Sequence, residues 1–264
     1  MLFRSKDAAV RKNAARLAAD RDNAPAEVQK AIRAMLDDKD GRARIDAVMA
    51  LGSFPPSREI ADALAAAWPS ASGDKFLQSA FVGAAMRGAG VSVAAALAKG
   101  SVESHGDFVR HLVRNVAVKG DGAVVSQLVI QLAAATGGTA LKAIALESLA
   151  TNYKGEAPPW DVNSGLHGAL RKLITSENPA VASSVIPLIG RWDKSGTMSG
   201  ELKPLVTSLT AKLSDASLGD DARAQAAINL LGVRTMDAGV IPAVAKLLAP
   251  PSSPALQKDR KSVV

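Results

Sequence analysis

The stretch Asp220–Ala249, with the sequence DDARAQAAINLLGVRTMDAGVIPAVAKLLA, decides the fold of this chain. In its first half, apolar residues recur at the spacing of one helical face, and Gly232 marks the end of that helix. In its second half, Ile241 and Val244 begin a second apolar stripe, which ends before Pro250. The stretch therefore predicts two amphipathic helices joined by a short polar turn.

The same pattern recurs along the whole chain. An apolar residue, often followed by a base, marks the start of each first helix every 32–34 residues, and this spacing lengthens to 40 and 41 residues in the fifth and sixth repeats. Just upstream lies a residue whose side chain can cap the helix: Asp7, Asp40, Asp74, Asp107, Thr139, Asn178, Asp220 and Ser253. The sequence thus predicts helix pairs starting near residues 7, 40, 74, 107, 139, 178 and 220, and a truncated eighth from 253.

The second helices follow in register. They are expected at residues 26–38, 58–68, 90–100, 123–135, 165–174 and 202–213, and around Ile241. Isolated helices of this length are marginal in water, so each pair must bury its apolar stripe on its neighbours. We therefore expect an all-α solenoid of about seven helix pairs, forming a single domain over residues 6–258.

Both ends of the chain look foreign to this pattern. Residues 1–5 and 259–264 are what the two strands of a common short-read sequencing adapter encode. We therefore predict that these two segments are adapter scars. The natural segment would then be an internal fragment of a longer protein.

Composition excludes several kinds of site. The 264 residues are 48% hydrophobic and only 3% aromatic, which suits helices packed on small residues. The absence of cysteine excludes disulfides, thiolate metal sites and covalent haem attachment within this chain. No apolar run approaches the roughly 18 residues of a membrane span, and the first residues lack the apolar stretch of a secretory signal. The formal net charge of +7 is a mild basic excess.

The recurrent bases of the first helices have two interpretations. They are Arg11, Arg44, Arg110, Lys142 and Arg223. A row of cations could bind phosphates or an acidic partner. Alternatively, each cation bonds neighbouring carbonyls or carboxylates between repeats, and this structural interpretation is favoured. The row is interrupted at Gln78, Ala182 and Gln257, and aromatic residues for base stacking are scarce.

No catalytic, cofactor or metal site is predicted. His105 and His111 are six residues apart, which does not place two ligands on one helical face, and His167 has no ligand partner at a suitable spacing. Motifs for serine hydrolases, nucleotide binding and zinc proteases are absent.

The longest loops carry the scarce aromatic residues. The fifth pair contains the loop TNYKGEAPPWDVNSG with Tyr153 and Trp160, and the sixth contains GRWDKSGTMSG with Arg191 and Trp192. Phe54 lies in the corresponding turn of the second pair. Aromatic residues on loops are typical of contact surfaces, so these five residues form a candidate interaction surface. In the favoured alternative, they fold back and seal the ends of the loops.

With the repeats aligned, the chain resembles HEAT-type (armadillo-like) helical repeats. DKFLQSAFVGAA at 74–85, AINLLG at 227–232 and VAKLLAPPSSPALQKD at 244–259 are similar, more narrowly, to the HEAT region of the large planctomycete-type membrane-bound dehydrogenases. That resemblance implies a right-handed superhelix between a β-propeller and a c-type cytochrome domain, in an exported redox protein. Haem c would belong to the parent protein only, and none of the family's catalytic or haem residues has a counterpart in this sequence.

The expected function is a non-catalytic scaffold whose partners are proteins or flanking domains of the same chain. The alternative is a stand-alone HEAT module that binds nucleic acid or a protein partner. Nucleic-acid binding would require Lys and Arg to cluster on the face formed by the second helices. A third option, a HEAT-type lyase or modification factor, would require a polar pocket that the sequence does not indicate.

Overall fold

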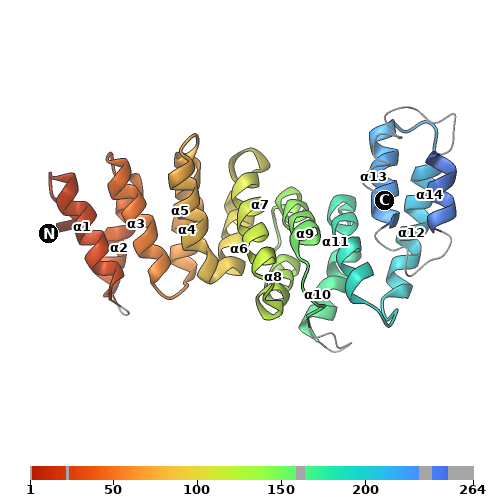
Figure 1. Cartoon of the computed structure of the whole chain (residues 1–264), viewed down its shortest axis with the longest axis horizontal. Coiled ribbons are helices and arrows are strands. Elements are labelled where there is room, and N and C mark those ends of the chain that lie inside the picture. Colours follow the sequence, from red (N-terminus) through yellow and green to blue (C-terminus); the bar gives the residue numbers. More distant parts are fainter. Residues whose placement is uncertain (1, 22–23, 159–163, 232–239, 249–264) are drawn as a thin grey trace. The chain divides into compact units, whose positions relative to one another are not determined.

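The computed structural model describes residues 2–21, 24–158, 164–231 and 240–248 (Figure 1). Within these ranges there are fourteen α-helices, four short 3-10 helices and no β-strand. The chain forms two compact units, Met1–Lys154 and Gly155–Val264. The prediction of an all-α fold is confirmed.

The first unit contains nine α-helices in the described residues. They are α1 (Ala8–Ala19), α2 (Ala26–Ala34), α3 (Gly41–Ser53), α4 (Arg58–Ala67), α5 (Lys75–Ala85), α6 (Ala89–Lys99), α7 (Val102–Lys119), α8 (Gly122–Ala134) and α9 (Thr139–Asn152). The 3-10 helices are η1 (Leu2–Arg4), η2 (Met35–Asp37), η3 (Trp68–Ala71) and η4 (Met86–Gly88). The first helices α1, α3, α5, α7 and α9 pack side by side in one row, and α4, α6 and α8 pack in a second row. This layered packing is compatible with a helical solenoid.

Capping residues fix where most first helices begin. The carboxylates of Asp7, Asp40 and Asp74 each accept a hydrogen bond from a main-chain N–H in the first turn of α1, α3 and α5. The expected cap at Asp107 is wrong, because Ser101 and Ser104 form a capping box that starts α7 earlier and leaves Asp107 inside the helix.

The cap of α9, the last helix of the first row, also differs from the predicted one. Thr139 is the first residue of α9 rather than its cap, and Gly138 occupies the cap position with a left-handed backbone at φ +63°. A Cβ atom at Gly138 would lie 2.7 Å from the carbonyl oxygen of Leu97, so this position requires glycine. Gly138 thereby allows the chain to approach α6 closely.

Small residues allow the first row to pack tightly. A Cβ atom at Gly52 of α3 would lie 2.6 Å from the Cα atom of Ala84 of α5, which shows how closely the two helices approach. Larger side chains such as Phe81, Leu112 and Leu128 fill the space between the rows and are 1% exposed or less. Burying each of these side chains contributes about 1.5–3 kcal/mol to folding.

The second unit contains α10 (Gly165–Ile174), α11 (Pro179–Trp192), α12 (Ser199–Ser214), α13 (Asp220–Leu231) and α14 (Val240–Leu248). Helix α11 packs on α13, while α12 packs on α10 and α14. Helices α13 and α14 contact each other, as expected for the pair predicted from Asp220–Ala249. The predicted eighth repeat from Ser253 lies outside the described residues, and so does the segment 259–264.

One helical run in the described residues, Lys75–Lys99, is long and apolar enough to cross a membrane. It consists of α5 and α6 separated by η4, and half of its apolar window is buried inside the protein. Length and composition alone therefore make it a weak candidate for a membrane span.

Candidate functional site

Three of the aromatic residues expected on a contact surface are buried. Phe54 and Tyr153 are 1% exposed and Trp192 is 4% exposed, whereas Arg191 is exposed and Trp160 lies outside the described residues. Phe54 and Tyr153 directly follow α3 and α9, and Trp192 is the last residue of α11. These three side chains therefore do not belong to an exposed interaction surface. An aromatic ring at the end of a helix gains more from burial than from exposure to water.

The insertion of the sixth pair is organised by a buried carboxylate. One oxygen of Asp193 accepts hydrogen bonds from the hydroxyls of Ser195 and Thr197 and from the Thr197 N–H, and the other accepts from the Met198 N–H at 2.8 Å. Burial alone would raise the pKa of Asp193, but these donors outweigh it and hold the pKa below its ordinary value. The carboxylate thus holds the loop that leads into α12, a role that the sequence analysis missed.

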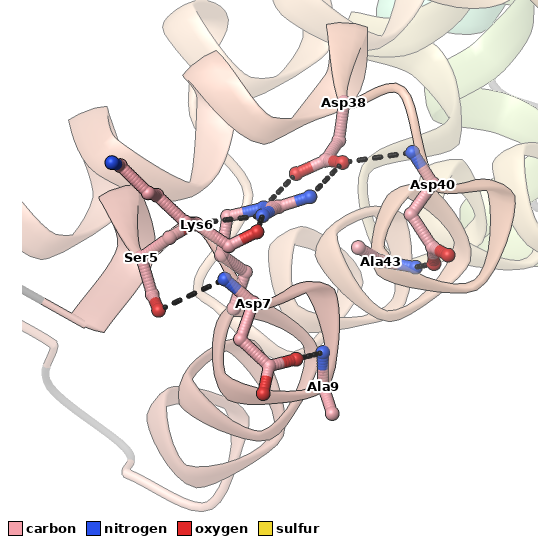
Figure 2. Close-up of polar contacts among 8 residues, drawn as sticks. Ser5, Lys6, Asp7, Ala9, Asp38, Asp40 and Ala43 are labelled. Carbon is pink, nitrogen blue, oxygen red and sulfur yellow. Dashed lines mark hydrogen bonds and ion pairs between the residues drawn. The ribbon is translucent and has the colours of Figure 1, made fainter.

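Arg11 bridges two successive repeats; its partners Ser5, Lys6 and Asp38 are labelled in Figure 2. Its Nε and Nη2 atoms donate to the two carboxylate oxygens of Asp38 at 2.6 and 2.7 Å, in a bidentate pair. Its Nη1 donates to the main-chain oxygens of Ser5 and Lys6 at 2.7 and 3.1 Å. The hydrogen bond from Arg11 lowers the pKa of Asp38 below its ordinary value, and the same bond raises the pKa of Arg11. The guanidinium therefore links the two repeats at their junction.

Three other bases of the row also have nearby partners. Arg110 donates to Asp107 at 2.6 Å. Lys142 donates to the carbonyl of Ala135 at 2.8 Å, and Arg223 donates to the carbonyl of Leu213 at 3.2 Å. The contacts of Lys142 and Arg223 join neighbouring repeats and fit the structural interpretation of the row, whereas Arg110 and Asp107 lie on the same helix, α7. Arg44 differs, because its Nε atom is buried without a hydrogen-bond partner in the described part of the chain.

The histidines do not gather at a site. His105 is buried, with Nε2 at 2.8 Å from the carbonyl of Ala65 and Nδ1 at 2.7 Å from the Ser104 hydroxyl. His111 is exposed on α7, and His167 is buried in α10. Within the described residues, no group of three or more His, Cys, Asp or Glu side chains is placed to hold a metal ion.

An uncharged surface runs along α6 and α8 in the second row. Its exposed or half-buried residues recur at three- or four-residue intervals along each helix. We name it the neutral face, and it comprises Gly90, Ala94 and Ala98 of α6 with Val124, Gln127, Gln131 and Ala134 of α8. A Cβ atom at Gly90 would lie 3.0 Å from the side chain of Gln131, so the two stripes adjoin.

The opposite character is found on α7 in the first row. Its exposed side chains include two acids near its start, Glu103 and Asp107, and three bases toward its end, Arg110, Arg114 and Lys119. A surface of mixed charge is typical of a helix that faces water. The neutral face therefore stands out as the candidate interaction surface of the first unit.

Comparisons with known proteins do not place the chain in a family. No family model matches it, and no curated protein matches it. Among solved structures, it is similar to a chain described as "Crystal Structure of Engineered Protein. Northeast Structural Genomics Consortium Target OR329". The identity is 19% and the TM-score 0.28, over 99% of this chain and 92% of that chain. A likeness at this level carries no argument about family or function.

Proposed function

We propose that this chain is a non-catalytic scaffold of HEAT type, a right-handed superhelix of helix pairs that binds proteins or flanking domains. The observation that supports it best is the neutral face of α6 and α8. Helix α8 carries no charged residue in thirteen, and α6 carries only Lys99 at its end. Charged residues are depleted at the centres of protein interfaces, so an adjoining pair of uncharged stripes fits a protein partner.

We further propose that the chain is the spacer of a large membrane-bound dehydrogenase, as the sequence resemblance implies. The partners would then be the propeller and cytochrome domains of the same protein. Haem c would be bound by the cytochrome domain, and the parent protein would be exported. The segments at 74–85 and 227–259 support this proposal through their likeness to that family.

Hydrogen exchange tests the interaction directly. Amide exchange is measured on this chain alone and on the complete reading frame with its flanking sequence. We expect slower exchange in α6 and α8 when the flanking domains are present, with α7 unchanged as the internal control. Unchanged exchange in both α6 and α8 would remove the proposed role of the neutral face.

The flanking genomic sequence tests the identity of the parent. A propeller upstream or a C-x-x-C-H motif downstream would support the dehydrogenase proposal. A natural start and stop codon next to this segment would contradict it.

Nucleic-acid binding is the second candidate function. It requires bases on the face of the second helices; α8 carries no Lys or Arg, whereas α2, α10 and α12 each carry two. Binding of duplex DNA is measured between about 50 and 200 mM salt, where phosphate contacts would make affinity fall steeply. Binding that is absent or independent of salt removes this candidate.

A further inference from the structure

A cavity between α5 and α7 corresponds to the junction that Arg11 bridges in the first repeat. We name it the α5–α7 cavity; its volume is about 190 Å³ and its lining is Trp68, Pro69, Ser72, Gln78, Glu103, Ser104 and Asp107. The hollow around Arg11 is larger, about 650 Å³, and is lined by Ser5, Lys6, Arg11, Asp37, Asp38, Lys39 and Asp40. Outside the foreign segment 1–5, three pairs of these residues are separated by the same 67 residues, namely Arg11 and Gln78, Asp37 and Ser104, and Asp40 and Asp107. The two places are therefore equivalent positions two repeats apart.

The cationic group that bridges the first junction is missing from the second. Gln78 stands where the first repeat has Arg11, and its shorter side chain makes no hydrogen bond within the described residues. His105 stands where the first repeat has Asp38, but its ring is turned to the carbonyl of Ala65. The cavity thus lies at the position equivalent to the Arg11 hollow, and it has no guanidinium in its lining.

The charge at the rim of the cavity favours a cation. Glu103 and Asp107 are the two charged residues of its lining. Asp107 is paired with Arg110, whereas Glu103 forms no ion pair within the described part of the chain. The pKa of Glu103 is lowered by a hydrogen bond from Ser101, so it is ionised at neutral pH. One negative charge therefore remains uncompensated.

An aromatic wall completes the cavity. Trp68 is packed edge-on against Phe81, with ring centroids 6.1 Å apart, and against Phe108 at 5.0 Å. These contacts fix the indole where it lines the cavity. An indole attracts a planar guanidinium more strongly than it attracts a neutral group.

We propose that the α5–α7 cavity binds the guanidinium of an arginine side chain supplied by a partner protein. The bound group would take the place that Arg11 takes in the first junction, with Glu103 as its counter-charge and Trp68 as its apolar wall. The site goes beyond the neutral face and rests on the proposed protein-interaction function.

The test uses a small probe, so that no partner has to be known. N-acetyl-L-arginine amide is titrated into the chain, and the backbone amide signals of Ser72 and Ser104 are followed by NMR. We expect saturable shifts with a dissociation constant on the order of millimolar, because a single side chain buries little surface. The citrulline analogue, which is neutral and has nearly the same shape, should bind at least about tenfold more weakly.

Two variants locate the site. Gln78→Arg should abolish probe binding by filling the cavity, and Glu103→Gln should weaken it about threefold or more. Asn13→Arg on α1 is the matched control, since it also replaces a neutral amide by arginine, on an exposed surface outside the neutral face, and it should leave binding unchanged. Circular dichroism confirms that each variant is folded.

The proposal is overturned if no saturable shift occurs, if the citrulline analogue binds as well as the arginine probe, or if Gln78→Arg leaves binding intact. None of these results affects the neutral face, which hydrogen exchange tests separately. Slower exchange in α6 and α8 without probe binding would therefore remove the cavity site and keep the scaffold.

Discussion

The junctions at Arg11 and at Gln78 lie at equivalent positions of the repeat, and they differ in the side chain present there. At Arg11 a guanidinium bridges a carboxylate of the next repeat and two main-chain carbonyls. At Gln78 a cavity of about 190 Å³ has two acids and no base in its lining, whereas the hollow at Arg11 is about 650 Å³ and contains the paired guanidinium. The base at Arg11 is therefore structural, and the position without a base is where we propose a binding site.

The largest expected effect comes from removing the aromatic support of the cavity. Phe108→Ala deletes a fully buried ring that contacts Trp68, so it should cost about 3–5 kcal/mol of stability. Phe76→Ala is the matched control, since Phe76 is 81% exposed and its loss should change stability by about 0.5 kcal/mol or less. Urea unfolding of both variants checks the contrast, and equal losses would contradict the described packing.

The second largest loss of stability is expected at the Arg11 junction. Asp38→Asn removes the charge that pairs with Arg11, so Tm should fall by several degrees. Asp37→Asn is the control, because Asp37 lines the same surface, is exposed and forms no contact with Arg11. Calorimetry that finds equal shifts for the two variants would show that the bridge contributes nothing.

Low pH should remove the stability that the Arg11–Asp38 pair contributes. The pKa of Asp38 is lowered in the folded chain, so its contribution to stability is present above the unfolded value of about 3.9 and is lost as the pH falls through the folded pKa. The difference in Tm between the parent chain and Asp38→Asn should therefore be large at pH 7 and shrink below about pH 4. A difference that persists unchanged at about pH 2 would argue against an ion pair.

The smallest effect is a gain at the second junction. Gln78→Arg should raise Tm by about 1 °C, because the new pair with Glu103 is exposed and such pairs contribute little. Adding Glu103→Gln to this variant should cancel the gain. A gain that survives the second substitution would not come from the charge pair.

Periodicity and capping chemistry predicted most of the fold. The second helices α4, α6, α8 and α10 begin and end within a residue of their expected positions. The start of α7 was missed because Ser101 and Ser104 cap one another two turns before Asp107, and two serines are a weak signal beside an aspartate.

The burial and the contacts of the site residues depend on tertiary structure, which the sequence did not predict. The sequence around Trp192 does not predict whether its side chain is exposed or buried. Its burial follows from its place at the end of α11. Asp193 became recognisable as a loop organiser only through the donors of Ser195, Thr197 and Met198. The interruption at Gln78 was visible in the sequence, but the cavity beside it required the positions of η3 and α7.

The central claim is that the α5–α7 cavity has the place and the charge for a guanidinium. A crystal structure of the Gln78→Arg variant tests it most directly. We expect the introduced guanidinium to lie inside the cavity, within hydrogen-bond distance of the Ser72 main-chain oxygen and of the Glu103 carboxylate. A side chain that extends into solvent and leaves the cavity empty would contradict it.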